Sequence, residues 1–189
     1  MATQPQTGLT YEDLQAFPED NLRREIIDGE LIVTAAPATR HQQVVAMLVY
    51  SFYAYCIEHG GVVLPAPYDV YFSDTNVVEP DVIYVREENR VRLEKKFLRA
   101  APDLVVEVSS PTTRRLELVR KRELYERFGV PEYWFVDLDA DRVEVYRLDQ
   151  NRYGYPLLFA RGKTIDTPQA PGLALSVDDL LGAPEDAEE

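Results

Sequence analysis

The sequence predicts an α/β (α+β) fold in which helices flank a central mixed β-sheet. Three observations predict it. A hairpin signal, Asp28-Gly29, precedes a long apolar segment with helical spacing; four strand-like segments follow; and a second helical segment separates these from three further strands. Because this order is neither a regular alternation of strands and helices nor a run of strands alone, helices packed on a mixed sheet are the expected architecture.

The N-terminal elements are expected to be a short helix and a hairpin. Thr10 is a good helix cap with acidic residues behind it, and Pro18 ends the helix. In residues 25–33, Asp28-Gly29 joins two apolar stretches, which is the strongest short signal for a hairpin.

A long helix is predicted over Thr39–His59, with a glycine pair behind it. Because this segment is apolar on nearly every side, we expect the helix to lie at the centre of the molecule. A second helix is expected over residues 113–128, between Pro111 and Gly129. Strands are expected at residues 62–64, 68–72, 77–85, 103–109, 132–138, 143–148 and 153–159, and one helical turn near residues 177–181.

Length and composition predict one domain in a reducing compartment. The 189 residues should form a flexible N-terminus (1–9), a single domain (10–181) and an acidic tail (182–189). Cys56 is the single cysteine, which excludes an internal disulfide and favours a cytoplasmic location. The longest apolar run, residues 44–57, is too short to cross a bilayer, so no membrane role is expected. The net charge of −13 argues against a polyanionic partner.

Acidic side chains interrupt two strands that are otherwise almost wholly apolar. Glu79 and Asp81 lie in one predicted strand, and Glu107 with Ser109 in another. Side chains alternate along a strand, so each pair shares one face. A buried ionised carboxylate is costly unless a cation, a metal or hydrogen bonds offset its lost hydration. These acids therefore either cap turns and pair with arginines, or form a functional site.

Lys121 is the cation of the second helix that is directed toward these strands. With about 100° of rotation per residue, it falls in the middle of an apolar arc formed by Leu118, Leu124, Tyr125 and Phe128. A lysine on such a face needs a partner, and Glu107 or Asp81 is the natural candidate. A structural ion pair and a catalytic group both remain open.

Two acids on neighbouring strands beside an inward lysine suit metal-assisted hydrolysis. Carboxylate oxygens bind Mg²⁺ or Mn²⁺, which would hold a phosphodiester and activate a water, while the ammonium would orient that water or stabilise developing charge. Pro80-Asp81 with Glu107-Val-Ser109 resembles the motif of the PD-(D/E)XK nuclease superfamily, although the last position is usually lysine.

A wider pattern resembles the Uma-two family of restriction endonucleases over residues 11–146. The matching segments are Glu25-Ile-Ile-Asp28-Gly29-Glu30, His41, Glu79-Pro-Asp81-Val, Pro102-Asp-Leu-Val-Val-Glu107-Val-Ser-Ser-Pro111, Lys121 with Tyr125, and Gly129-Val-Pro-Glu-Tyr-Trp134. In that family the motif lysine is moved from the strand to the following helix, where Lys121 lies. Ser109 therefore does not imply an inactive site.

The resemblance implies a restriction endonuclease-like fold and a site. Asp81 and Glu107 would bind Mg²⁺ (or Mn²⁺), and Lys121 would be the catalytic lysine. Glu25 matches the family's upstream acid, and is either a further ligand or an acid on an exposed hairpin edge. The resemblance also makes a homodimer plausible, because cutting two strands needs two sites.

Other conspicuous residues are expected to be structural. His41 should cap or pack the first turn of the long helix rather than act as a base. Trp134 and its aromatic neighbours Tyr133 and Phe135 should lie in the core rather than stack on bases. Glu79 matches no motif position.

The sequence therefore favours a metal-dependent DNA endonuclease. The alternative is a non-catalytic nuclease-fold interaction or regulatory module, in which the acids and lysine form a salt bridge. A glycosidase with paired carboxylates ranks last, because an inward lysine would keep both acids ionised. Residues 86–127, from Arg86 to Arg127, hold twelve basic against eight acidic side chains, a local charge of +4 through which DNA contact remains open despite the overall acidity.

Overall fold

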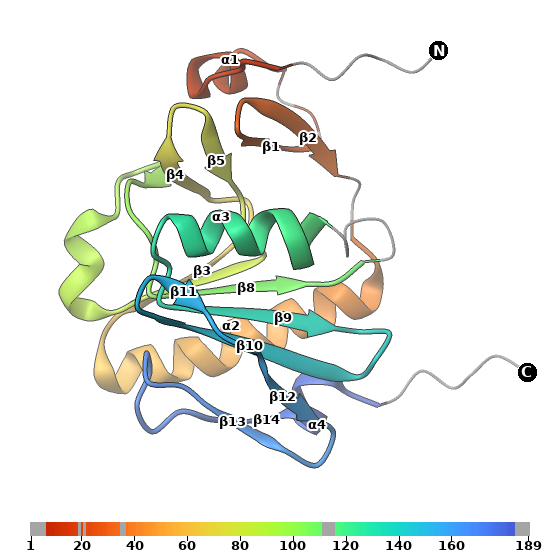
Figure 1. The fold of residues 1–189 in the computed structure, drawn as a ribbon. Coiled ribbons are helices and arrows are strands. Elements are labelled where there is room, and N and C mark those ends of the chain that lie inside the picture. The colour runs from red at the N-terminus through yellow and green to blue at the C-terminus, as the bar shows by residue number, and fades with distance from the viewer. Residues whose placement is uncertain (1–6, 19, 21, 35–36, 111–115, 184–189) are drawn as a thin grey trace, which may run out of the picture.

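The computed structural model describes residues 7–18, 20, 22–34, 37–110 and 116–183 (Figure 1). Most of the expected flexible N-terminus (1–9) and acidic tail (182–189) lies outside the described residues. The start expected for the second helix, at residues 113–115, lies outside them as well.

A mixed sheet forms the centre of the molecule, as predicted. Its strand order is β11-β10-β9-β8-β6-β3, with β12 also paired to β10; β8 and β9 run parallel and the other pairs are antiparallel. The strands are β3 (Val62–Pro65), β6 (Val82–Val85), β8 (Leu104–Val108), β9 (Glu132–Asp137), β10 (Arg142–Asp149), β11 (Arg152–Tyr153) and β12 (Leu157–Ala160).

Two smaller sheets accompany the central one. The larger has the order β2-β1-β5-β4-β7, and the smaller pairs β13 with β14. Their strands are β1 (Arg23–Ile27), β2 (Glu30–Thr34), β4 (Asp69–Ser73), β5 (Asn76–Val78), β7 (Phe97–Leu98), β13 (Thr164–Asp166) and β14 (Ala174–Ser176). The hairpin of β1 and β2 turns at Asp28 and Gly29, both with positive φ, as its sequence predicts.

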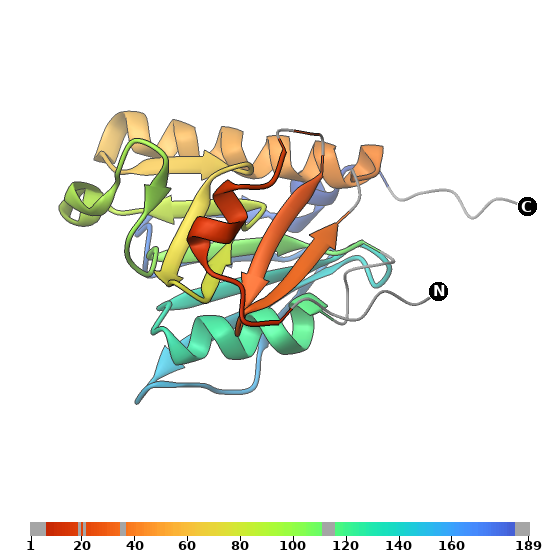
Figure 2. The same cartoon turned by 90° about the horizontal axis from the view of Figure 1, so that it is seen from above.

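Helices cover both faces of the central sheet. The long α2 (Thr39–His59) lies on one face and α3 (Arg122–Arg127) on the other (Figures 1 and 2). The remaining helical elements are α1 (Tyr11–Gln15), η1 (Glu87–Arg92), η2 (Leu116–Lys121) and α4 (Val177–Leu181). Thr10 caps α1 through a capping box with Asp13, as expected from the sequence.

Side chains that alternate along the strands of the central sheet divide the core into two layers. Val106 and Trp134 face α2, where the Trp134 ring lies 5.9 Å from that of Phe52. Val105 and Tyr133 face the opposite layer, which contains α3. Because Glu107 has the same parity as Val105, its side chain is directed to the α3 side of the sheet.

The expectation that α2 lies at the centre of the molecule is wrong. Its buried apolar side chains are Val44, Leu48 and Phe52, whereas Tyr50, Tyr53 and Ile57 are exposed. The helix is therefore an outer layer, because the sheet covers only one of its sides.

Three other expectations need correction. The strand expected over residues 77–85 is broken at Glu79-Pro80-Asp81, and its halves, β5 and β6, belong to different sheets. Pro80 cannot donate a ladder hydrogen bond, which favours the break. The strand expected at residues 153–159 is likewise split into β11 and β12, and η2, at the start of the second helix, is π-helical rather than α-helical. β13 and β14 were not predicted.

Gly61→Ala is expected to lower the free energy of unfolding by about 1–3 kcal/mol. Gly61 has φ +93, and a Cβ there would lie 2.9 Å from the Val85 carbonyl oxygen. Urea denaturation measures the change. Gly154→Ala is the control, since a Cβ at Gly154 meets nothing within 4 Å and its φ is ordinary. An equal effect of both substitutions would contradict the steric explanation.

Candidate active site

Strand register brings the two principal acids together. Val82 of β6 pairs with Val106 of β8 in antiparallel register. Asp81 precedes the first of these residues and Glu107 follows the second, so the two carboxylates lie at the same end of the strand pair. β5, which ends just before Asp81, pairs with β1 of the second sheet. Strands of both sheets therefore meet near Asp81.

Glu25 reaches the same point from β1. Its Oε1 accepts a hydrogen bond from the backbone nitrogen of Glu79 at 2.8 Å, and the residue is only 1% exposed. The alternative that Glu25 is an acid on an exposed hairpin edge is therefore wrong.

Lys121 lies between two of the carboxylates, as its place in the apolar arc indicated. Its Nζ is 2.8 Å from Glu25 Oε1 and 3.0 Å from Glu107 Oε1, and the lysine is 2% exposed. The Tyr125 hydroxyl also donates to Glu107 Oε1. Burial raises the pKa of Glu107 above its ordinary value, and the Lys121 ammonium opposes that rise. The wider π-helical turn of η2 ends at this lysine.

Asp81 is held by three donors. Its Oδ2 accepts from the Val108 backbone nitrogen at 2.8 Å and lies 3.1 Å from His41 Nε2, while its Oδ1 accepts from Arg23 at 2.7 Å. Burial works to raise the pKa of Asp81, but the hydrogen bond from His41 and the charge of Arg23 hold it well below its usual range. Asp81 is consequently ionised at neutral pH.

Arg23 is the site residue that the sequence reasoning missed. Its NH2 lies 3.7 Å from Glu25 Oε1 and 3.8 Å from Glu107 Oε2, and its Nε lies 3.8 Å from Glu79 Oε2. One signal could have found it: Arg23 stands two residues before Glu25 on a strand, so both side chains share a face.

A pocket of about 480 Å³ gives access to the cluster from one side. Arg23, His41, Glu79 and Asp81 are among the residues that line it. Burial, reinforced by the charge of Asp69, raises the pKa of Glu79 to about 7. Because Asp81 lines the pocket, the pocket opens onto the Asp81 side of the carboxylate cluster.

The remaining conspicuous residues have mostly structural contacts. Ser109 Oγ accepts a hydrogen bond from the Leu138 backbone nitrogen at 2.9 Å. Trp134 is fully buried in the core, as predicted. Of the two structural roles expected for His41, capping is wrong, because the N-cap of α2, Ala38, has no side-chain cap hydrogen bond. The His41 ring is buried in the first turn of α2 and contacts Asp81.

The donor atoms of the cluster suit a hard cation. Glu25 Oε2 and Glu107 Oε2 are buried and have no hydrogen-bond partner among the described residues. Carboxylate oxygens are the ligands that Mg²⁺ and Mn²⁺ prefer. In the part of the chain that the structure describes, however, no three side chains of His, Cys, Asp or Glu converge closely enough to hold a metal ion together. The carboxylates are suitable ligands for a divalent cation, and in this structure the Arg23 and Lys121 side chains lie between them.

The sequence pattern of the Uma2 (Uma-two) family, described as "Putative restriction endonuclease", matches residues 10–178. The chain belongs to this family. Its fold is similar to the crystal structure of "a putative nuclease belonging to DUF820" from Anabaena variabilis, with a TM-score of 0.79 and 22% identity over 92% of this chain and 97% of that chain. Comparison with curated proteins finds no match. The expected family and restriction endonuclease-like fold are confirmed.

The helices of this Uma2 protein give no sign of a membrane span. Within the described residues, none is both long and apolar enough to cross a bilayer.

Proposed function

We propose that this Uma2 protein is a metal-dependent endonuclease that hydrolyses phosphodiester bonds of DNA. The observation that carries the proposal is the meeting of Glu25, Asp81, Glu107 and Lys121 beside a pocket. Two of the carboxylate oxygens accept no hydrogen bond from the residues that the structure describes. Burying three carboxylates is costly, and clusters of this kind concentrate at functional sites.

In the proposed mechanism Asp81 and Glu107 would hold Mg²⁺ or Mn²⁺, and Glu25 would be a further ligand. When bound, the cation lowers the pKa of the attacking water and neutralises phosphate charge. Lys121 orients that water or stabilises the charge that develops on the phosphate. Tyr125 fixes Glu107 through its hydroxyl, and His41 fixes Asp81, so each acid is held in one orientation.

DNA contact through residues 86–127 is part of the proposal, but several cations of this stretch already have acidic partners. The ion pairs are Arg86 with Glu88, Arg90 with Glu87, Arg99 with Glu94, Arg120 with Glu30 and Arg127 with Asp28. The local charge of +4 is therefore not a continuous free basic surface. Arg114 and Arg115 lie outside the described residues.

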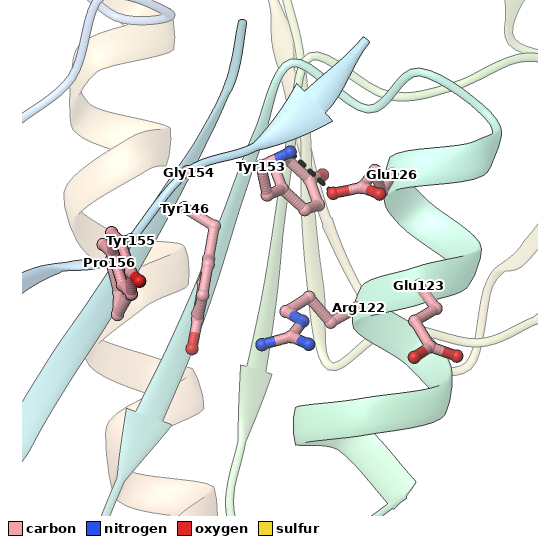
Figure 3. Close-up of a pocket in the computed structure, with 8 residues that line it drawn as sticks. All are labelled: Arg122, Glu123, Glu126, Tyr146, Tyr153, Gly154, Tyr155 and Pro156. Atoms are coloured by element: carbon pink, nitrogen blue, oxygen red, sulfur yellow. Dashed lines mark hydrogen bonds between the residues drawn. The ribbon is translucent and has the colours of Figure 1, made fainter.

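Arg122 of the same stretch faces a second pocket, of about 420 Å³, which lies between α3 and the strands β10 and β11 (Figure 3). Its guanidinium carbon lies 5.5 Å from the centroid of the Tyr146 ring. Glu123 and Glu126 also line this pocket, so its acids outnumber its one arginine. The first pocket is also acidic, with Asp20, Glu79 and Asp81 against Arg23, so charge balance does not separate the two pockets. We assign the scissile phosphate to the first pocket because a metal held by Asp81 would neutralise phosphate charge there.

The test is cleavage of supercoiled, linear and single-stranded DNA by the purified protein. Cleavage is expected with Mg²⁺ or Mn²⁺ and not with EDTA. Asp81→Asn should lower the rate about a hundredfold or more, because the metal supplies several kcal/mol of transition-state stabilisation. Asp149→Asn, which changes an exposed acid at the end of β10, should not alter it. Absence of cleavage of every DNA form with both metals would overturn the proposal.

A second candidate, the non-catalytic interaction or regulatory module, is favoured by one observation. Arg23 and Lys121 place a cation beside each of the three carboxylates, so the cluster also forms a closed salt-bridge network. Calorimetry separates the two candidates, because divalent-metal binding that depends on Asp81 and Glu107 is expected only for the nuclease.

The homodimer and the cytoplasmic location are further parts of the proposal. The first is supported by the family resemblance and the second by the single cysteine, Cys56. Sedimentation of the purified protein tests the dimer.

A further inference from the structure

The Arg23 side chain bridges the two acids that would hold the metal. Its NH1 lies 2.7 Å from Asp81 Oδ1, and its NH2 lies 3.8 Å from Glu107 Oε2. A divalent cation held by Asp81 and Glu107 would lie between the same two carboxylates. The guanidinium and the metal therefore compete for one place.

The guanidinium fits this place imperfectly. Only the contact with Asp81 is a hydrogen bond, and Nε and NH2 are buried with no hydrogen-bond partner among the described residues. A buried donor without a hydrogen bond destabilises this arrangement. Glu107 Oε2, at 3.8 Å from NH2, is also unsatisfied. A small cation that binds this oxygen directly would remove part of this destabilisation.

The Arg23 side chain is partly exposed to the pocket, whereas the Lys121 side chain is buried. The Arg23 side chain is 24% exposed and lines the pocket beside Asp81. The Lys121 side chain is 2% exposed and lies within 3.0 Å of two carboxylates. Of the two cations, Arg23 is thus the one that can leave.

Formal charge favours a cation at this place. Counted formally, the Glu25, Asp81 and Glu107 carboxylates sum to −3, and Lys121 supplies +1. Burial works to lower the pKa of Arg23, but the three carboxylates raise it above its ordinary value. Arg23 supplies the second positive charge without metal, and a divalent ion in its place would bring the formal sum to zero.

We propose that Arg23 is the built-in counter-cation of the metal-free site, and that a divalent metal binds Asp81 and Glu107 only after displacing its guanidinium toward the pocket. This inference rests on the proposed function, because it assumes a metal at these two acids. Arg23 is a positioning residue: it holds the carboxylates together until the metal arrives and lowers the apparent metal affinity.

The test is calorimetric titration of Mn²⁺ into the wild-type protein, Arg23→Gln and Arg24→Gln. Arg23→Gln is expected to bind Mn²⁺ on the order of tenfold more tightly, because the competing charge is gone. Arg24 is the matched control: it lies next along β1, its side chain has the opposite parity, and it pairs with Asp20 at 2.7 Å. Arg24→Gln removes the same net charge and should leave the affinity within about twofold of wild type, since Arg24 pairs with Asp20 and forms no ion pair with Asp81 or Glu107 among the described residues.

Thermal unfolding provides a second readout. Without metal, Arg23→Gln should melt below the wild type, because Asp81 loses its hydrogen-bonded cation and the carboxylates of Glu25, Glu79 and Glu107 lose a nearby positive charge. Saturating Mn²⁺ should raise its melting temperature by more than it raises that of the wild type, as tighter binding to the folded state requires. If Arg23→Gln does not fold without metal, Arg23→Lys replaces it. A single ammonium bridges the carboxylates more weakly than a guanidinium, so the Arg23→Lys variant should still bind Mn²⁺ more tightly than the wild type.

The outcomes separate this inference from the proposed function. Tighter binding by the Arg23 variant, with wild-type binding detectable, supports both. Equal or weaker binding by the variant overturns the inference alone. Binding by the variant but not by the wild type supports the inference and overturns the metal-dependent enzyme, and binding by neither overturns both.

Discussion

Glu107→Gln is expected to abolish divalent-metal binding and to lower DNA cleavage about a thousandfold or more. Glu107 is fully buried, and its two oxygens differ: Oε1 accepts from Lys121 and Tyr125, whereas Oε2 has no hydrogen bond among the described residues. Glutamine keeps the shape but removes the charge, so both the metal and Lys121 lose a partner. The cleavage rate should therefore fall further in Glu107→Gln than in Asp81→Asn.

Cleavage rates and Mn²⁺ calorimetry on the same preparation measure the effect. Glu144→Gln is the matched control, because Glu144 is also a buried glutamate of the central sheet but pairs with Arg142 and Tyr146. Circular dichroism checks that both variants are folded. A folded Glu107→Gln that still cleaves DNA at the wild-type rate would remove Glu107 from the mechanism.

Lys121→Met is expected to lower the free energy of unfolding of the metal-free protein by about 3–5 kcal/mol. Methionine fills similar volume but leaves Glu25 and Glu107 buried without the ammonium that lies 2.8 and 3.0 Å from them. Urea denaturation measures the change. The double variant Lys121→Met with Glu107→Gln should recover part of the loss, because one of the uncompensated charges is gone.

Lys163→Met is the control for this prediction. Lys163 is exposed, and its substitution should change the free energy of unfolding by no more than about 0.5 kcal/mol. If Lys121→Met were as mild as this control, the buried carboxylates would need another source of compensation.

Stability and proposed function are linked in this site. The acids that would bind the metal are the same ones that must be compensated when no metal is present. Lys121 does this permanently, from a buried position, whereas Arg23 does it from the edge of the pocket. A fixed and a displaceable cation together would allow the chain to fold before the metal binds.

Much of the local structure could be predicted because local periodicity reports it. The helix over Thr39–His59 and the hairpin at Asp28-Gly29 follow from spacing and turn chemistry within a few residues. The inward direction of Lys121 follows in the same way, since its neighbours one turn away are apolar. Even the π-helical geometry of η2 did not change the side to which Lys121 points.

The family, the fold class and the sides on which Glu107 and Lys121 lie are readable from the sequence, because strand alternation and helical spacing specify the direction of a side chain. The contacts of each side chain are visible only in the folded chain: Arg23 between the carboxylates, His41 on Asp81, and the break that puts β5 and β6 in different sheets. The physical reason is that these contacts depend on strand pairing between segments far apart in the chain. The local sequence pattern contains no information about which distant residue compensates a buried charge.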